Sequence, residues 1–175
     1  VYAVIEVKSH LDATELRKSI RTIGKVKRMP KTCYFPQLFQ KQPHLYGKVY
    51  DGFFPTFGFI FAYGSNDLIN MSEEFIETLR TQPYEERIDA VWVLGKGSYN
   101  WIEPTTKSPN PSSAPGLWLG VGATDPEQDV LLNMVATIGP QMAQVFMPPF
   151  NFIPYIKDAT FVASAQVRGP VDFIG

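Results

Sequence analysis

The sequence has little of several features that define common protein classes. It holds one cysteine, Cys33, and two histidines among 175 residues, which excludes an internal disulfide and a cysteine-based zinc site. Its 16 basic and 17 acidic residues give a net charge of −1, so nucleic acid could be bound only by a local basic patch. No apolar run reaches the roughly 18 residues of a membrane-spanning helix, and we expect a cytoplasmic protein with no membrane partner.

Composition and element pattern are those of one globular domain. Hydrophobic residues make up 45% and charged residues 19% of the chain, as in folded proteins, and we predict a single domain over residues 1–175. Apolar runs bounded by turn residues predict strands at 1–9, 57–63, 88–94, 98–103 and 117–121. Helices are predicted from 13 to 29, from the cap Ser72 to Pro83, and after the cap Thr124. Strands alternating with helices predict an α/β sheet protein.

Several finer expectations follow from local patterns. The turn at Gly95–Gly97 should pair the strand at 98–103 antiparallel with the strand before it, and the strand at 117–121 should lie at an edge. In the last helix the predicted inward residues are Leu131, Leu132, Val135, Ile138, Met142 and Val145, with a kink or restart at Gly139-Pro140. Proline, glycine and polar residues predict irregular segments at 31–52, 104–116 and from 148 onward.

The first nine residues, Val1–Ser9, organise the rest of the chain. Five apolar residues run into Glu6, which is followed by Val7 and Lys8, and such a run predicts a strand buried on both faces. Glu6 and Lys8 are two positions apart, so their side chains should point to the same side of the sheet. Charged groups at the end of a buried strand are costly unless they are paired or bind a metal.

This pattern suits metal-assisted hydrolysis of phosphodiesters. A carboxylate such as Glu6 can hold Mg²⁺ or Mn²⁺, and a bound metal ion lowers the pKa of its water. The ammonium of Lys8 can position a water or stabilise charge on a phosphate. A plain Glu–Lys ion pair that ends a strand is the alternative interpretation, because a three-residue match is common by chance.

The helix that follows is strongly basic. Asp12 is its predicted N-cap, with Glu15 three residues later, and Leu16, Ile20 and Ile23 form its apolar stripe. Basic residues occupy the other faces: Arg17, Lys18, Arg21, Lys25, Lys27 and Arg28, with Lys31 just beyond. We expect Arg17, Lys18, Arg21 and Lys25 to bind the phosphate backbone of a nucleic acid. An ordinary solvated helix face is the alternative.

A family resemblance rests on the same residues. Val4-Ile5-Glu6-Val7-Lys8-Ser9, followed by Leu11 and the basic helix, resembles the third core strand of the PD-(D/E)XK nuclease superfamily. The segments VYAVIEVKSHL, FGFIFAYGS and IDAVWVLGKG, in this order, resemble a bacterial family of nuclease-like domains within it. The resemblance implies a restriction-endonuclease-like mixed sheet flanked by helices, DNA as substrate, Glu6 as a catalytic metal ligand and Lys8 as the catalytic lysine.

The superfamily pattern extends upstream of this chain. It includes an Asp on the preceding strand and usually a Glu on an earlier helix, and only five residues precede Glu6. We therefore expect the chain to be the C-terminal part of a longer protein, with its N-terminal core elements missing. The strand of Glu6 would then lie at a sheet edge, to be completed by the missing segment or by a second chain, for example in a homo-oligomer.

Three functions fit these observations. The first is a metal-dependent nuclease domain, a Mg²⁺-dependent endonuclease if the upstream acidic residues are present. The second is a catalytically inactive nuclease fold that binds nucleic acid or a protein. The third is a structural or assembly subunit, with the aromatic and proline-rich C-terminal half as its interaction surface.

Overall fold

The computed structural model describes residues 3–30, 44–45, 48–49, 56–102, 118–122 and 130–143. Its elements are β1 (Ala3–Lys8), α1 (Ala13–Arg28), β2 (His44–Leu45), β3 (Lys48–Val49), β4 (Phe57–Ala62), α2 (Leu68–Arg80), the 3₁₀ turn η2 (Tyr84–Glu86), β5 (Ala90–Val93), β6 (Gly97–Ile102), β7 (Trp118–Gly122) and α3 (Val130–Ala143). Cys33, Lys31, Thr124, the segment 104–116 and the tail from 148 lie outside the described residues. In the described part, no helix has the length and apolar character that crossing a bilayer requires.

The centre of the fold is a mixed five-stranded sheet in the order β1-β4-β5-β6-β7. β1, β4 and β5 run parallel, and β6 and β7 are antiparallel to their neighbours. The predicted α/β class, the antiparallel pairing through Gly95–Gly97 and the edge position of β7 are confirmed. β1 ends the order on the other side and pairs only with β4 among the described strands, which confirms its predicted edge position.

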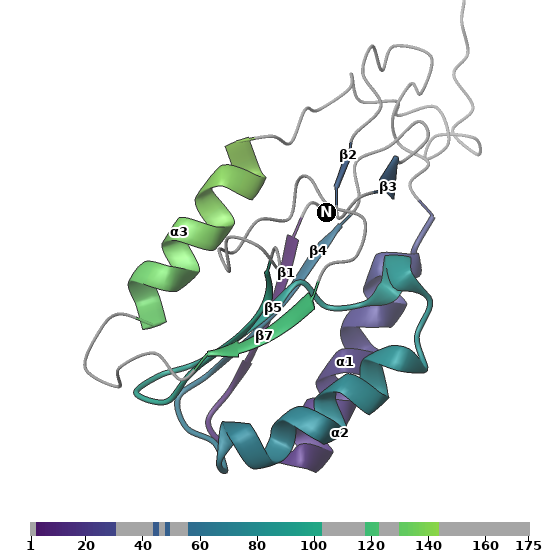
Figure 1. Cartoon of the computed structure of the whole chain (residues 1–175). Coiled ribbons are helices and arrows are strands. Elements are labelled where there is room, and N and C mark those ends of the chain that lie inside the picture. The colour runs from purple at the N-terminus through teal and green to yellow at the C-terminus, as the bar shows by residue number, and fades with distance from the viewer. Residues whose placement is uncertain are drawn as a thin grey trace, which may run out of the picture.

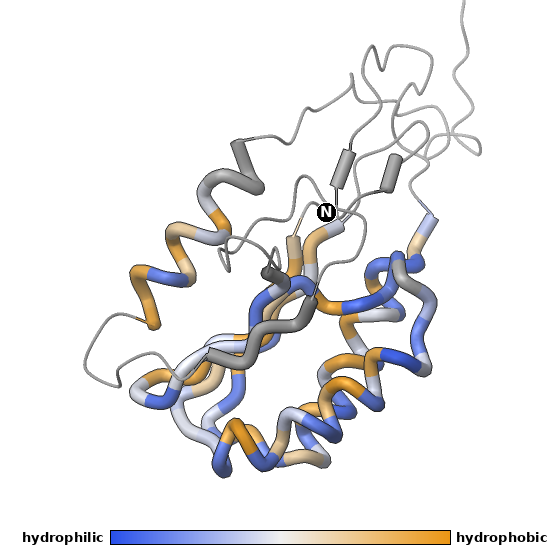
Figure 2. The backbone as a smooth tube through the Cα atoms, viewed as in Figure 1, coloured by the Kyte–Doolittle hydropathy of each residue, from blue (hydrophilic) through white to orange (hydrophobic). Residues whose placement is uncertain are grey.

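Helices cover the two faces of this sheet (Figure 1): α1 and α2 lie on one face and α3 on the other. On the first face, the predicted stripe of Leu16, Ile20 and Ile23 is buried against the sheet. The Asp12 carboxylate accepts a hydrogen bond from the Glu15 amide at 2.8 Å, so the predicted N-cap is confirmed. Apolar and polar residues alternate along α1 and α2 (Figure 2), as expected where one face of each helix is buried.

The start of α2 differs from the prediction. Asp67, not Ser72, is the N-cap, and its carboxylate accepts hydrogen bonds from the amides of Ile69 at 2.7 Å and Asn70 at 3.3 Å. Ser72 lies within the helix, where its hydroxyl donates to the Ile69 carbonyl. Both residue types favour N-caps, and aspartate adds a negative charge at the positive end of the helix. The cap, at position 67 and not 72, therefore lies five residues earlier than predicted.

The second sheet face packs against α3 through residues that the sequence pattern only partly identified. Val130, Met134 and Ile138 contact the cluster of Phe57, Phe59 and Trp92. Of the predicted inward residues, Ile138 is confirmed, whereas Leu131, Leu132 and Val135 are 51%, 61% and 66% exposed. α3 is apolar on several sides, so hydrophobicity alone did not define its inner face. The helix is continuous through Gly139 and Pro140, so the predicted restart does not occur.

Two other expectations are corrected. β1 is not buried on both faces, because Ile5 and Val7 on the side away from α1 are 41% and 57% exposed. Only Ala3 on that side packs against the cluster beneath α3. The segment predicted to be irregular between α1 and β4 contains a small antiparallel pair, β2 with β3.

Candidate functional site

Glu6 and Lys8 lie side by side on β1 and face α1. The Lys8 ammonium is 2.8 Å from Glu6 Oε1 and 2.6 Å from Glu15 Oε2. The Ser19 hydroxyl donates a hydrogen bond to Glu6 Oε1 at 2.9 Å. The predicted common orientation of Glu6 and Lys8 is confirmed, and the ion-pair interpretation describes their geometry correctly.

The charges around Lys8 fix its protonation state. The hydrogen bond to Glu15, and then that to Glu6, raises the pKa of Lys8 above its ordinary value despite partial burial. Reciprocally, the Lys8 ammonium lowers the pKa of Glu15. Lys8 is therefore a cation at neutral pH. In this state it can hold or neutralise a phosphate oxygen but cannot accept a proton.

Glu6 retains one oxygen for another partner. Its Oε2 atom is buried and accepts no hydrogen bond within the described part of the chain. A buried acceptor without a partner is unfavourable, and a carboxylate oxygen suits a hard divalent cation. Glu6 therefore fits the predicted role of metal ligand. No group of three or more His, Cys, Asp or Glu side chains among the described residues could hold a metal ion, so a complete ligand set would need groups from elsewhere.

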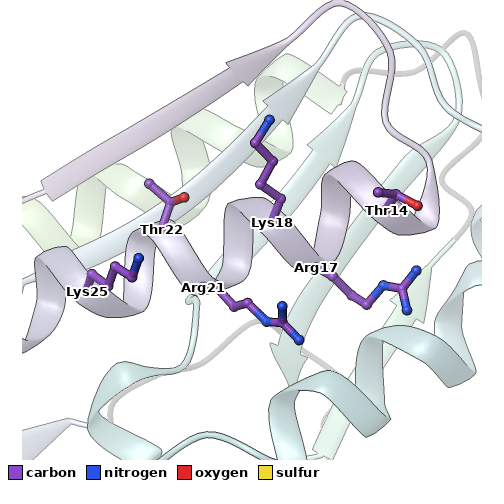
Figure 3. A pocket seen from close by; sticks show the side chains of 6 residues that line it. All are labelled: Thr14, Arg17, Lys18, Arg21, Thr22 and Lys25. Carbon is purple, nitrogen blue, oxygen red and sulfur yellow. The ribbon is translucent and has the colours of Figure 1, made fainter.

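A basic groove of about 360 Å³ runs along the exposed side of α1. It is lined by Thr14, Arg17, Lys18, Arg21, Thr22 and Lys25, so all four predicted nucleic-acid-binding residues contribute to it. Figure 3 shows Arg17 and Arg21 extending to one side of the helix and Lys18 to the opposite side. The lining residues carry four cations and two hydroxyl groups, and all of these can donate hydrogen bonds to an anion.

The groove and the Glu6–Lys8 pair are linked by Glu15. One oxygen of Glu15 contacts Lys8, and the other is 3.5 Å from the ammonium of Lys18, a groove residue. Carboxylates and ammonium groups thus alternate from Glu6 through Lys8 and Glu15 to Lys18. Lys18 is therefore the groove residue that connects, through Glu15, to the candidate catalytic pair.

Two of the basic residues expected on the helix surface form ion pairs outside the groove. Lys27 is buried, with its side chain 5% exposed and its ammonium 2.8 Å from Asp89 Oδ2. Arg28 contacts Glu86 at 2.7 Å. The expectation of a continuous basic face therefore holds for residues 17–25 but not for Lys27, which anchors α1 to the start of β5.

Sequence reasoning missed the roles of Glu15 and Ser19. The sequence pattern connects Glu15 only with the N-cap Asp12, whereas its side chain contacts Lys8. A signal was present, because Glu15 and Ser19 are four residues apart and flank the apolar stripe that begins at Leu16. That spacing puts both side chains on the same side of the helix, and the structure places this side over β1.

No model of a known protein family matches the sequence, and no curated protein matches it. Among solved structures, it is similar to the apo form of NucC from Escherichia coli MS115-1, with 18% identity and a TM-score of 0.53 over 90% of this chain and 62% of that one. The cAAA-bound NucC of Pseudomonas aeruginosa ATCC27853 gives 16% identity and a TM-score of 0.55 over 90% and 58%. The cAAA-bound E. coli protein gives 17% and 0.53 over 90% and 57%.

The likeness to NucC shows a shared fold. It confirms the predicted α/β architecture, a mixed sheet with flanking helices. This chain spans less than two thirds of the length of each of the three NucC chains.

Proposed function

We propose that this chain is a nuclease-like domain that cleaves DNA with the help of a divalent metal ion. The observation that carries the proposal is the position of Glu6 and Lys8, which Glu15 connects to a groove lined by four cations. The nuclease-like fold that the chain shares with NucC supports it, as does the resemblance of the β1 segment to the PD-(D/E)XK motif strand.

Each group has a distinct role in this proposal. Glu6 would hold Mg²⁺ or Mn²⁺ through its free carboxylate oxygen, and the bound ion would supply an activated water and neutralise charge on the phosphate. Lys8, kept as an ammonium by Glu15 and Glu6, holds an oxygen of the scissile phosphate. Arg17, Lys18, Arg21 and Lys25 hold the flanking DNA backbone without reading bases.

The edge of β1 is the proposed place for completing the sheet. Its outer side has no partner strand among the described elements, and Ile5 and Val7 are exposed beside it. A further strand, from an upstream segment or from a second chain, would pair with β1 and cover these residues. The same addition could bring the remaining metal ligands next to Glu6.

Cleavage of supercoiled plasmid in Mg²⁺ or Mn²⁺ by the whole protein tests the proposal. Glu6→Gln and Lys8→Met should each lower the cleavage rate by about 100-fold or more, as the loss of a group that stabilises transition-state charge does. Glu77→Gln is the matched control, because it makes the same change of charge at a surface residue whose only ion pair among the described residues is with Arg80. Cleavage by Glu6→Gln at the wild-type rate would eliminate the assignment.

A catalytically inactive nuclease fold that binds nucleic acid is the second candidate. The observation that favours it is that Lys8 is already paired with Glu6 Oε1 and Glu15, and Glu6 Oε1 also accepts a hydrogen bond from Ser19. DNA binding that weakens steeply with salt, without cleavage in any divalent metal, would support this function over the first.

A further inference from the structure

The four cations of the groove fall into two classes. Arg21 and Lys25 make no ion pair with any residue in the described ranges, so they are available to a ligand. Arg17 Nε lies 3.5 Å from Glu74 Oε1, and Lys18 lies 3.5 Å from Glu15 Oε1. Each cation of the second class already faces a carboxylate, which offsets part of its attraction for an anion.

The contact of Arg17 with Glu74 joins two helices. Arg17 lies on α1 and Glu74 on α2, and their side chains are 44% and 40% exposed. At this exposure, and at a separation of 3.5 Å, the pair is weak. A phosphate can therefore displace Glu74 from Arg17, but the displaced carboxylate stays close and repels the phosphate.

We propose that Glu74 sets the affinity of the groove for a DNA backbone by competing with phosphate for Arg17. The inference rests on the proposed DNA-binding role of the groove and adds to it a residue on a different helix. Glu74 opposes binding, whereas Arg21 and Lys25 form the part of the groove that is ready without rearrangement. The arrangement keeps the groove weak until a ligand engages several cations at once.

Glu74 can be altered without disturbing the Glu6–Lys8 pair. Its side chain makes no ion pair other than that with Arg17 in the described part of the chain. Glu15 is unsuitable for the same test, because its other oxygen holds Lys8.

The test measures binding of a fluorescein-labelled DNA duplex to the whole protein in EDTA, where cleavage does not occur. Glu74→Gln should tighten binding by about two- to fivefold at physiological salt, the range that the weakness of exposed ion pairs implies. Glu73→Gln is the matched control. It removes the same charge at an exposed neighbour on α2 that forms no ion pair among the described residues, and adjacent helix positions do not face the same way.

A double-mutant cycle identifies Arg17 as the residue through which Glu74 acts. In the wild-type background, Arg17→Gln should weaken binding less than Arg21→Gln does. In the Glu74→Gln background, Arg17→Gln should weaken binding about as much as Arg21→Gln, because Arg17 is then free to contact phosphate. Equal tightening by Glu74→Gln and Glu73→Gln, or an equal effect of Arg17→Gln in both backgrounds, would overturn the inference.

The test of the coupling between Arg17 and Glu74 can succeed or fail independently of the test of the proposed nuclease function. The coupling between positions 17 and 74, found in a protein that does not cleave DNA, would support the inference and reject the nuclease. Glu6-dependent cleavage without this coupling would do the reverse. A wild-type protein that does not bind the duplex in EDTA even at low salt would overturn the inference, whatever the cleavage assay shows.

Discussion

Breaking the ion pair of Lys27 with Asp89 should be among the most destabilising single changes that can be made to this fold. Its side chains are 5% and 2% exposed, and the two charged atoms are 2.8 Å apart. Lys27 also donates a hydrogen bond to the Arg87 carbonyl, and Asp89 Oδ2 also accepts one from the Gly58 amide at 2.6 Å. The pair thus ties the C-terminal end of α1 to β4 and to the start of β5.

Removing one partner leaves the other charge buried without an opposite charge beside it. For Lys27→Met we expect a loss of about 3–5 kcal/mol in the free energy of unfolding, as for other broken buried pairs. Small folded proteins have about 5–15 kcal/mol in total, so this change removes a large share of the stability. The expected fall in Tm is roughly 6–20 °C for a chain of this size.

Urea unfolding at pH 7, followed by circular dichroism, gives the measurement. The control is Arg28→Met, which changes the next residue. The Arg28 side chain is 65% exposed, so its ion pair with Glu86 should contribute only about 0.2–1 kcal/mol to the free energy of unfolding. Adding Asp89→Asn to Lys27→Met should restore part of the loss, because it neutralises the orphaned carboxylate. If Lys27→Met lowers stability no more than Arg28→Met does, the reasoning from burial is wrong.

Two further predictions concern β1 and its contacts. Lys8 lowers the pKa of Glu15 in the folded protein. Their ion pair therefore stabilises the fold fully at pH values above the usual glutamate pKa of about 4.3, and this stabilisation is lost as the pH falls through the lower pKa of Glu15 in the folded state. The stability difference between wild type and Glu15→Gln, measured by urea unfolding, should be present at about pH 6 and shrink toward about pH 3; a difference independent of pH would contradict this. Val7→Lys should suppress concentration-dependent association in sedimentation velocity, because Val7 is 57% exposed on the edge strand and an inserted lysine blocks edge pairing. Unchanged association would show that the β1 edge is not the contact.

The elements with strong local signals were predictable from the sequence. α1 has an Asp12 cap, a clean stripe of three buried residues and a terminating proline, and the structure places its ends at Ala13 and Arg28. β5 and β6 are joined by the turn Gly95–Gly97, where both glycines adopt positive φ values of 68° and 132°. Such backbone angles favour glycine, so the turn could be recognised from the sequence.

Other features depend on tertiary contacts that local patterns do not contain. In α3, Leu131 and Val130 are adjacent apolar residues, and only the packing of the helix against the sheet decides that Val130 is buried. Lys27 resembled its basic neighbours in α1, and its burial follows from Asp89, 62 residues later in the chain. At the candidate site, the pairing of Glu6 with Lys8 was an open alternative. The contact of Glu15 with Lys8 forms only because α1 packs across β1, and this packing is not visible in the local sequence.

Ion pairs fasten α1 to the sheet near both of its ends, Glu15 with Lys8 and Lys27 with Asp89. The helix that carries the groove is therefore a rigid platform before any ligand arrives. When a polyanion binds to this helix, the protein backbone is already ordered. The conformational entropy lost by the protein is then confined to a few long side chains, and costs about 0.5–1.5 kcal/mol for each side chain immobilised. Loss of either ion pair would therefore lower the affinity of the groove for its ligand without altering any residue that lines the groove.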